Sequence, residues 1–214
     1  MRRTALCLFL AAMPVCASVV VTNPDCLPPT DPNDAYVGQY HQWANIDLTA
    51  PAHARFTACN PVPTVIGGSE THSFNSTVSG NLFINGVPQG FIVANAITTV
   101  TETLESNNGG VEVFNTEMTQ LDINAGGILI RESPTLSSTG QTTIADTGGG
   151  LFRIDSFFDV FTDLSLDGGQ TWIPSSGPGP GGSTVMSLTE LPEPGSLLLM
   201  GTGIAALLTR LRRR

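Results

Sequence analysis

Residues 71–172 alternate short runs of β-branched and apolar residues with glycine-rich turns. This pattern is typical of antiparallel strands, because glycine and asparagine adopt the positive φ angles that hairpin turns require. The longest runs, residues 91–103 and 111–123, flank the turn Asn-Asn-Gly-Gly at 107–110. We therefore predict an all-β fold, a single β-sandwich of the jelly-roll type.

Other glycine and asparagine positions mark further turns in the same region. They lie at residues 79–81, 85–86, 125–127 and 148–150, and residues 133–141 have the composition of a loop. Each turn would end one strand and begin the next, which is consistent with many short strands.

The spacing of apolar residues in 152–166 fits both the period of a strand and that of a helix. As a strand they place Ile154, Phe158 and Val160 on one face with Phe152, Leu164 and Leu166, and most of the aspartates on the other. As a helix they would also form an apolar stripe, so periodicity does not decide between the two. The flanking glycines and the aromatic content favour a strand.

The segment that follows resembles an Asp-box hairpin. Residues 165–172 read Ser-Leu-Asp-Gly-Gly-Gln-Thr-Trp, which fits the pattern S-x-D-x-G-x-T-W. In such hairpins the Asp and Ser/Thr side chains bond the turn backbone and the Trp packs beneath. The resemblance implies a structural role, and one copy is too few for a propeller.

Glycine, proline and serine dominate residues 175–183, a composition that does not build a core. We therefore predict that the folded domain spans residues 18–174. Residues 175–190 are predicted to be a linker between this domain and the C-terminal tail.

Charge is distributed unevenly along the chain. Residues 18–190 contain 17 acidic residues and three arginines, a formal charge of −14, and the chain has no lysine. A surface this negative repels phosphate backbones and anionic lipids. Nucleic-acid binding is therefore excluded. The absence of lysine also excludes Schiff-base chemistry and a P-loop.

The first residues have the features of an export signal. Two arginines precede an apolar run at residues 5–12, and Val15-Cys16-Ala17 places small residues before a cut between Ala17 and Ser18. We predict a signal peptide over residues 1–17. A lipoprotein signal at Cys16 and a buried N-terminal helix are the alternatives.

Two cysteines remain after such a cut. Cys26 and Cys59 would lie in an oxidising compartment, so we predict a disulfide between them. The three histidines are scattered, with no Cys/His spacing for zinc. We predict no metal site and no cofactor, and the sequence leaves calcium binding open.

No motif in the chain indicates catalysis, and we predict that the protein is not an enzyme. Asp155, Asp159 and Asp163 recur every four residues, which on a strand separates neighbouring carboxylates by about 13 Å. That separation is too long for a glycosidase pair. Two alternatives stay open: a carbohydrate-binding module that uses Tyr40, Trp43 or Trp172, and a hydrolase acting on matrix polysaccharide.

The last residues of the chain contain three parts in a fixed order. Pro192, Glu193 and Pro194 precede an apolar segment, residues 195–209, that would span the membrane. An arginine cluster then follows and would hold the chain in the membrane by the positive-inside rule. Its members are Arg210, Arg212, Arg213 and Arg214. This order, over residues 191–214, resembles the PEP-CTERM sorting signal of Gram-negative bacteria.

This resemblance implies processing by an exosortase, a membrane transpeptidase that would be the chain's partner. It also implies export, anchoring in the inner membrane during processing, and then a place at the cell surface or outside the cell. The family is associated with exopolysaccharide and biofilm, so exopolysaccharide is a second predicted partner. An ordinary membrane anchor without processing is the alternative.

Overall fold

The computed structural model describes residues 18–23, 34–55 and 61–191. They form thirteen strands and one short 3-10 helix, η1, which spans Pro180–Gly182. The strands are β1 Val19–Val21, β2 Asp34–Gly38, β3 Tyr40–Trp43, β4 Ile46–Arg55, β5 Ser69–Ile84, β6 Val87–Asn108, β7 Val111–Ala125, β8 Ile128–Glu132, β9 Ser138–Gly148, β10 Leu151–Val160, β11 Thr162–Ser165, β12 Ile173–Pro174 and β13 Thr184–Glu190.

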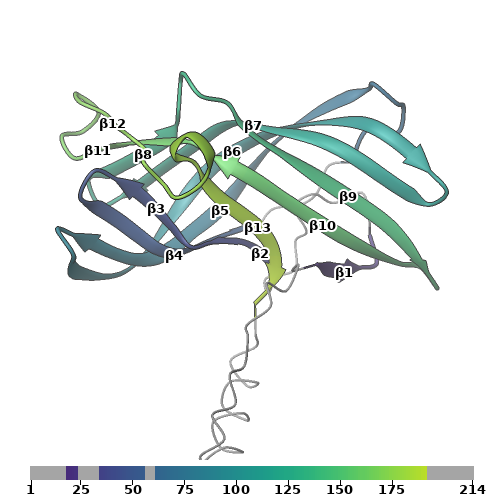
Figure 1. The fold of residues 1–214 in the computed structure, drawn as a ribbon, viewed down its shortest axis with the longest axis horizontal. Helices are drawn as coiled ribbons and strands as arrows, with labels where there is room; N and C mark the ends of the chain where they lie inside the picture. The colour runs from purple at the N-terminus through teal and green to yellow at the C-terminus, as the bar shows by residue number, and fades with distance from the viewer. Residues whose placement is uncertain (1–17, 24–33, 56–60, 192–214) are drawn as a thin grey trace, which may run out of the picture.

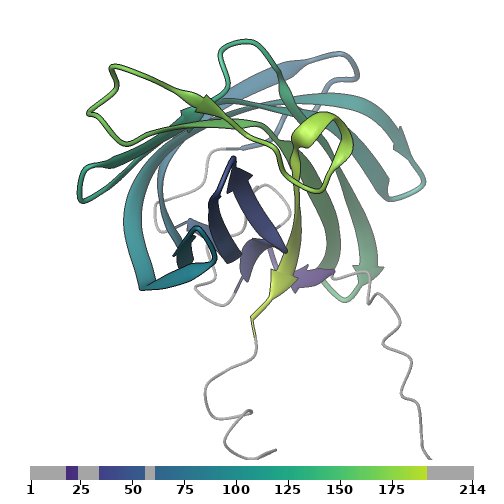
Figure 2. The same ribbon diagram turned by 60° about the vertical axis from the view of Figure 1, so that its left-hand side comes forward.

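Eight of these strands close into a barrel (Figures 1 and 2). Each strand pairs antiparallel with the next in the order β10, β13, β2, β4, β5, β6, β7 and β9. The ring closes where β9 also pairs with β10. The all-β prediction is confirmed, but one sheet closes on itself where we predicted the two packed sheets of a sandwich.

Long, bent strands make this closure possible. β6 contains 22 residues, and its pairing with β7 shifts register at Thr99/Val100 and again at Leu104/Ser106. Further register shifts interrupt the pairs β4–β5 and β5–β6. Because bulges bend a strand and increase its twist, they curve the sheet until its edges meet.

The tight turns mostly lie where glycine predicts them. At Asn85-Gly86 both residues have positive φ, 53° and 72°, as a type I′ hairpin turn requires. The prediction of a turn at residues 79–81 was wrong, because Gly80 lies inside β5. A Cβ there would lie 2.8 Å from the Cδ1 atom of Leu48, so this glycine permits the close approach of β4.

Residues 152–166 form strands and not a helix, as the flanking glycines favoured: β10 ends at Val160 and β11 spans Thr162–Ser165. Within β10, Ile154, Phe158 and Val160 face the core, as their alternation predicts. The prediction fails after Phe161, where β11 is buried on both faces and includes Asp163. Leu166, expected on the buried face, is 52% exposed because it lies in the following turn.

The linker prediction for residues 175–190 was wrong. β13 is a barrel strand that pairs with β10 on one side and β2 on the other. The glycine and proline residues before it form a compact loop, since the backbone amides of Ser175 and Ser176 donate to the carbonyls of Thr162 and Gln42. The folded domain therefore extends to Glu190 and not to Pro174.

Both ends of the described barrel lie on one side. Val19 in β1 pairs with Ile154 near the start of β10, and Glu190 at the end of β13 pairs with Asp34. Figures 1 and 2 show β1 beside the end of β13 at the lower side of the barrel. The strands β8, β11 and β12 lie at the upper left of Figure 1, away from these ends.

Candidate functional site

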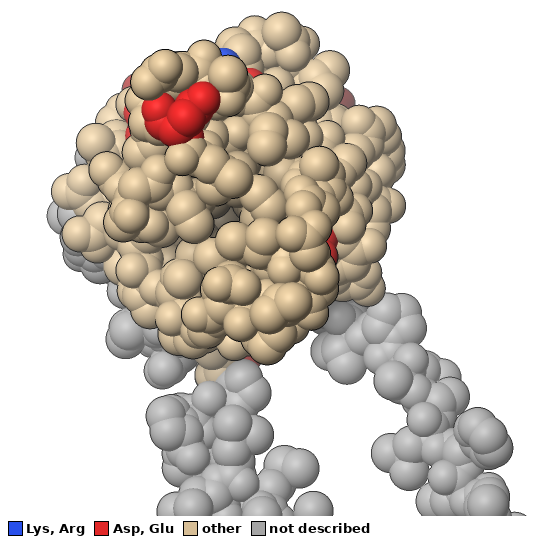
Figure 3. All heavy atoms as spheres, turned by 90° about the vertical axis from the view of Figure 1, so that its left-hand side faces the viewer, with Lys and Arg blue, Asp and Glu red and all other residues tan. Residues whose placement is uncertain are grey.

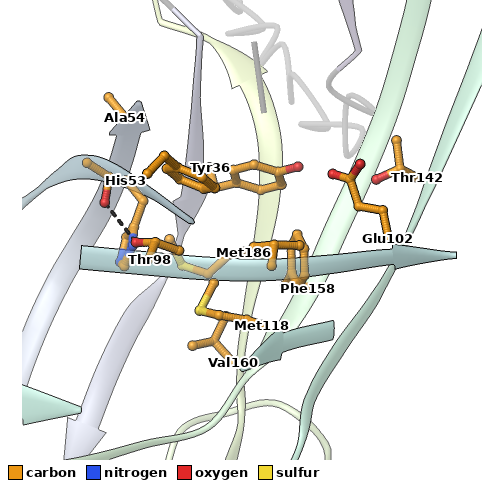
Figure 4. Close-up of a pocket in the computed structure, with 13 residues that line it drawn as sticks. Tyr36, His53, Ala54, Thr98, Glu102, Met118, Thr142, Phe158, Val160 and Met186 are labelled. Carbon is orange, nitrogen blue, oxygen red and sulfur yellow. Dashed lines mark hydrogen bonds between the residues drawn. The ribbon is translucent and has the colours of Figure 1, made fainter. Parts of the chain in front are cut away.

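The barrel encloses a small cavity to which all eight barrel strands contribute side chains (Figure 4). Inward-facing residues alternate with outward-facing ones along each strand, so the lining combines apolar and hydroxyl groups. The lining includes Tyr36, His53, Glu102, Met118, Thr142 and Phe158.

Hydroxyl groups form a chain across this lumen. The Tyr36 hydroxyl lies 2.7 Å from Ser156 Oγ, which lies 2.7 Å from Thr142 Oγ1. Burial raises the pKa of Tyr36 well above its usual value, and the hydrogen bond from Ser156 offsets only part of this rise. Tyr36 is therefore neutral, and either hydroxyl of the Tyr36–Ser156 pair can donate to the other.

Ionisable groups also lie inside the barrel. His72 and Glu102, which are 3% and 2% exposed, approach to 3.6 Å between His72 Nε2 and Glu102 Oε2. Burial lowers the pKa of His53 to about 4. Burial, and then the nearby His53, lower the pKa of His41 to about 3. His41 and His53 are therefore uncharged at neutral pH.

The lumen is too small for a ligand of ordinary size. Its cavity has a volume of about 30 Å³, which is room for about two water molecules. Trp43, one of three aromatic residues named for the carbohydrate-binding alternative, is also enclosed: it is 0% exposed, and its Nε1 donates to Thr162 Oγ1 at 3.1 Å. Trp43 is therefore a core residue and not a sugar platform.

A larger hollow lies on the outer face of the barrel. This groove has a volume of about 460 Å³, within the range of small-molecule sites. β5, β6, β7, β8 and the hairpin that follows β11 contribute to it. Its lining includes Asn75, Asn95, Asp122, Asn124, Arg131 and Trp172.

The Asp-box hairpin places Trp172 at this groove. The Asp167 carboxylate accepts hydrogen bonds from the Thr171 hydroxyl at 2.6 Å and the Thr171 amide at 2.9 Å. Ser165 Oγ accepts from the Gly169 amide at 2.8 Å, and Trp172 Nε1 donates to the Gly169 carbonyl at 3.1 Å. The hydrogen bonding expected of this motif is thus present.

These bonds predict a measurable property of the hairpin. The hydrogen bonds from the Thr171 side chain, then from its backbone, then from Ser165 lower the pKa of Asp167 to about 2. We expect Thr171→Val to raise this pKa toward its usual value, because the strongest donor is lost. NMR titration of the Asp167 carboxyl measures it, with Thr147→Val, at the exposed end of β9, as a control. An unchanged pKa in Thr171→Val would contradict this account of the hairpin.

Arg131 fixes the other side of the tryptophan. Its guanidinium carbon lies 3.9 Å from the centre of the Trp172 ring, and its Nη2 donates to Asp163 Oδ2 at 3.2 Å. A cation over an indole face is attracted by the ring quadrupole. The ion pair and the stacking together hold Trp172 in place before any ligand arrives.

One carboxyl group elsewhere has a strongly shifted pKa. Burial raises the pKa of Glu132 to about 8, and the neighbouring Glu117 and Asp163 contribute to the rise. Glu132 lines neither the lumen nor the groove. No cluster of three or more potential metal ligands occurs in the part of the chain that the structure describes.

Several residues of the sequence predictions lie outside the described residues. These are the signal peptide with Ala17, both cysteines of the Cys26–Cys59 pair, and the tail with Pro192, Glu193, Pro194 and the terminal arginines. Ser18, on the other side of the predicted cut, immediately precedes β1. Within the described residues no helix is long and apolar enough to cross a membrane.

Comparison with known proteins identifies the tail. Residues 190–214 match the PEP-CTERM protein-sorting motif, which confirms the resemblance read from the sequence. No curated protein and no solved structure matches the chain. The motif marks an exported protein that an exosortase processes at the membrane.

Proposed function

We propose that this protein is a non-catalytic component of the cell surface or extracellular matrix of a Gram-negative bacterium, associated with exopolysaccharide and biofilm. The observation that carries the proposal is the sorting motif, which begins at Glu190, the last residue of β13. The motif therefore follows the folded barrel directly. The chain is anchored in the inner membrane during processing and is then released to the surface.

The architecture supports display of the barrel away from a membrane. β1 and the end of β13 lie together, so the two ends of the described chain are on the same side of the barrel. The groove is formed in part by β8 and the hairpin after β11, which lie away from these ends. A barrel tethered at either end would keep this groove open to the surroundings.

The sorting tail predicts different results for two changes. We expect Glu193→Ala to leave membrane insertion intact but to block release from the inner membrane, because the exosortase reads the Pro-Glu-Pro triplet. Two prolines hold the triplet extended, and a carboxylate suits a positively charged pocket. The measurement is fractionation of a host that carries an exosortase.

Two further variants separate sorting from simple anchoring. Glu70→Ala removes an exposed carboxylate on β5, outside the sorting motif, and is expected to behave like the unchanged protein. Deletion of residues 210–214 is expected to weaken membrane retention, so that the chain escapes before processing. A Glu193→Ala protein with unchanged distribution would support an ordinary anchor and oppose the sorting proposal.

A second function, carbohydrate binding, is favoured by the outer groove. An exposed hollow that combines a half-buried tryptophan with several amide side chains suits a sugar, which has apolar C–H faces and a rim of hydroxyls. Trp172 is the predicted aromatic residue that this function uses. Trp43 takes no part because it is buried.

We also propose that the domain has no hydrolase activity. Glu132 has the raised pKa of a general acid, but it lines neither of the two hollows described above. Turnover of polysaccharide by the purified chain that a single substitution of Glu132 abolishes would overturn this part of the proposal.

A further inference from the structure

We propose that the outer groove binds an internal segment of a neutral polysaccharide that lies across β5, β6, β7 and β8. This inference rests on the second proposed function, carbohydrate binding, and assigns its site and ligand class. Delivery through the sorting tail is a separate matter, because the groove contains none of the tail's residues.

Strand register places the groove residues in one row. Asn75 of β5 pairs with Ile97 of β6, Ile97 pairs with Asp122 of β7, and Asp122 pairs with Arg131 of β8. Neighbouring strands lie about 4.8 Å apart, so this row is about 14 Å long. The strand spacing is similar to the repeat of an extended glycan, so successive sugars would meet successive strands.

The polar groups in this row, and Asn95 beside it on β6, are available to a ligand. Asn75 and Asn95 are exposed, and their side chains form no hydrogen bond with any residue that the structure describes. Each amide can both donate to and accept from a sugar hydroxyl. Asp122 is exposed and accepts a hydrogen bond from Gln120 Nε2, which orients its carboxylate.

Apolar groups complete the match to a sugar. Ile97 is 51% exposed at the centre of the row, and Trp172 and Leu129 border the groove. A pyranose ring presents C–H groups that pack on such surfaces while its hydroxyls reach the amides. Arg131 and the Asp-box hydrogen bonds hold Trp172 in place, so the Trp172 side chain loses little conformational entropy when a ligand binds.

The charges in the groove and on the whole domain indicate which class of glycan can bind. Arg131 is paired with Asp163, which leaves Asp122 as the unpaired charge of the row. The domain as a whole has a formal charge of −14, so a uronic-acid or sulfated polymer is repelled. The described atoms in Figure 3 are mostly uncharged, with acidic groups near its upper edge. The groove therefore favours neutral sugars.

The test is titration of the full chain with cellohexaose, laminarihexaose and N-acetylchitohexaose, and with hexagalacturonate as the acidic counterpart. The chain has two tryptophans, and Trp43 is buried, so a change in fluorescence reports Trp172. We expect at least one neutral hexasaccharide to bind and hexagalacturonate not to bind. Trp172→Ala lacks this reporter, so its titration is followed by calorimetry alongside the unchanged protein, and the substitution is expected to weaken binding by about tenfold or more.

Matched variants distinguish the groove from the rest of the surface. Asn95→Ala and Asp122→Ala, both exposed, are expected to weaken binding, while Gln141→Ala on β9 and Phe157→Ala on β10 are expected to leave it unchanged. In Trp172→Ala the remaining Trp43 reports that the barrel is folded. Failure of every neutral hexasaccharide to bind, or binding of hexagalacturonate alone, would overturn the proposal without affecting the sorting experiment.

Discussion

A chain that ends at Pro174 is expected to be unfolded, whereas one that ends at Glu190 is expected to fold. Removal of residues 175–190 deletes β13, which lies between β10 and β2 and closes the barrel. Met186 and Leu188, which are 1% and 0% exposed, leave the core with it. Loss of these two side chains and of the backbone hydrogen bonds of β13 lowers the free energy of unfolding by about 10 kcal/mol. That is comparable to the whole stability of a typical domain.

The comparison is made on secreted chains that begin at Ser18, by near-ultraviolet circular dichroism and urea unfolding followed by Trp43 fluorescence. Point variants grade the effect. Leu188→Ala is expected to lower the free energy of unfolding by about 3 kcal/mol, and Val185→Ala, on the exposed side of β13, by much less. Equal unfolding midpoints for the chains ending at Pro174 and Glu190 would show that β13 is dispensable.

The error about β13 shows where composition misleads. Residues 175–183 have the composition of a spacer, and the sequence prediction extended this spacer to the tail. Yet Thr184, Met186 and Leu188 alternate with exposed or half-buried residues, the period-2 signal of a strand. A strand pattern after a glycine-rich stretch is therefore better taken as part of the domain.

Local features of the fold could be predicted because short-range chemistry determines them. The turns at Asn85-Gly86 and Gly109-Gly110 depend on positive φ angles, and the Asp-box bonds join residues at most four apart. Barrel closure could not be predicted, since the pairing of β13 with β2 joins segments about 150 residues apart. Nothing local in either segment specifies its partner.

The outer groove could not be predicted from the sequence either. Trp172 was a candidate from its residue type, but Asn75 and Asp122 carried no signal in the sequence. Three strand pairings bring these two residues into register with Arg131, and the pairing of β8 with β11 brings the hairpin beside them. Candidate sites on sheet surfaces are therefore visible only after register is known.

Stability of the domain is expected to be greatest near pH 6.5 and to fall on both sides. Burial lowers the pKa of His41 to about 3 and that of His53 to about 4. Below the usual histidine pKa of 6.5 the unfolded chain binds these two protons while the folded barrel does not. Each histidine therefore removes up to about 1.4 kcal/mol of stability per pH unit as the pH falls from 6.5 toward 4.

Glu132 changes the stability with pH in the opposite direction to the two histidines. Burial raises its pKa to about 8, so the folded barrel keeps a proton that the unfolded chain releases above pH 4.5. Its contribution is complete below pH 4.5 and is lost as the pH rises to 8, by up to about 1.4 kcal/mol per unit. Between pH 6.5 and 4.5 two histidines outweigh one carboxyl group, so the net loss is about 2 to 3 kcal/mol.

Urea unfolding of the barrel across pH 4 to 8 measures the decline in stability on both sides of pH 6.5. Two variants show which residues cause each decline. Glu132→Gln keeps an oxygen that can accept from the Ser138 amide and is expected to remove the decline above pH 6.5. His53→Gln is expected to remove nearly all of the decline between pH 6.5 and 4.5, because the one remaining histidine is balanced by Glu132, and to leave the decline above pH 6.5 unchanged. Each variant is the control for the other, because Glu132→Gln flattens the curve above pH 6.5 and steepens it below, whereas His53→Gln changes only the part below pH 6.5. A native curve that rises steadily from pH 6.5 to 8 would show that Glu132 is ionised in the folded barrel.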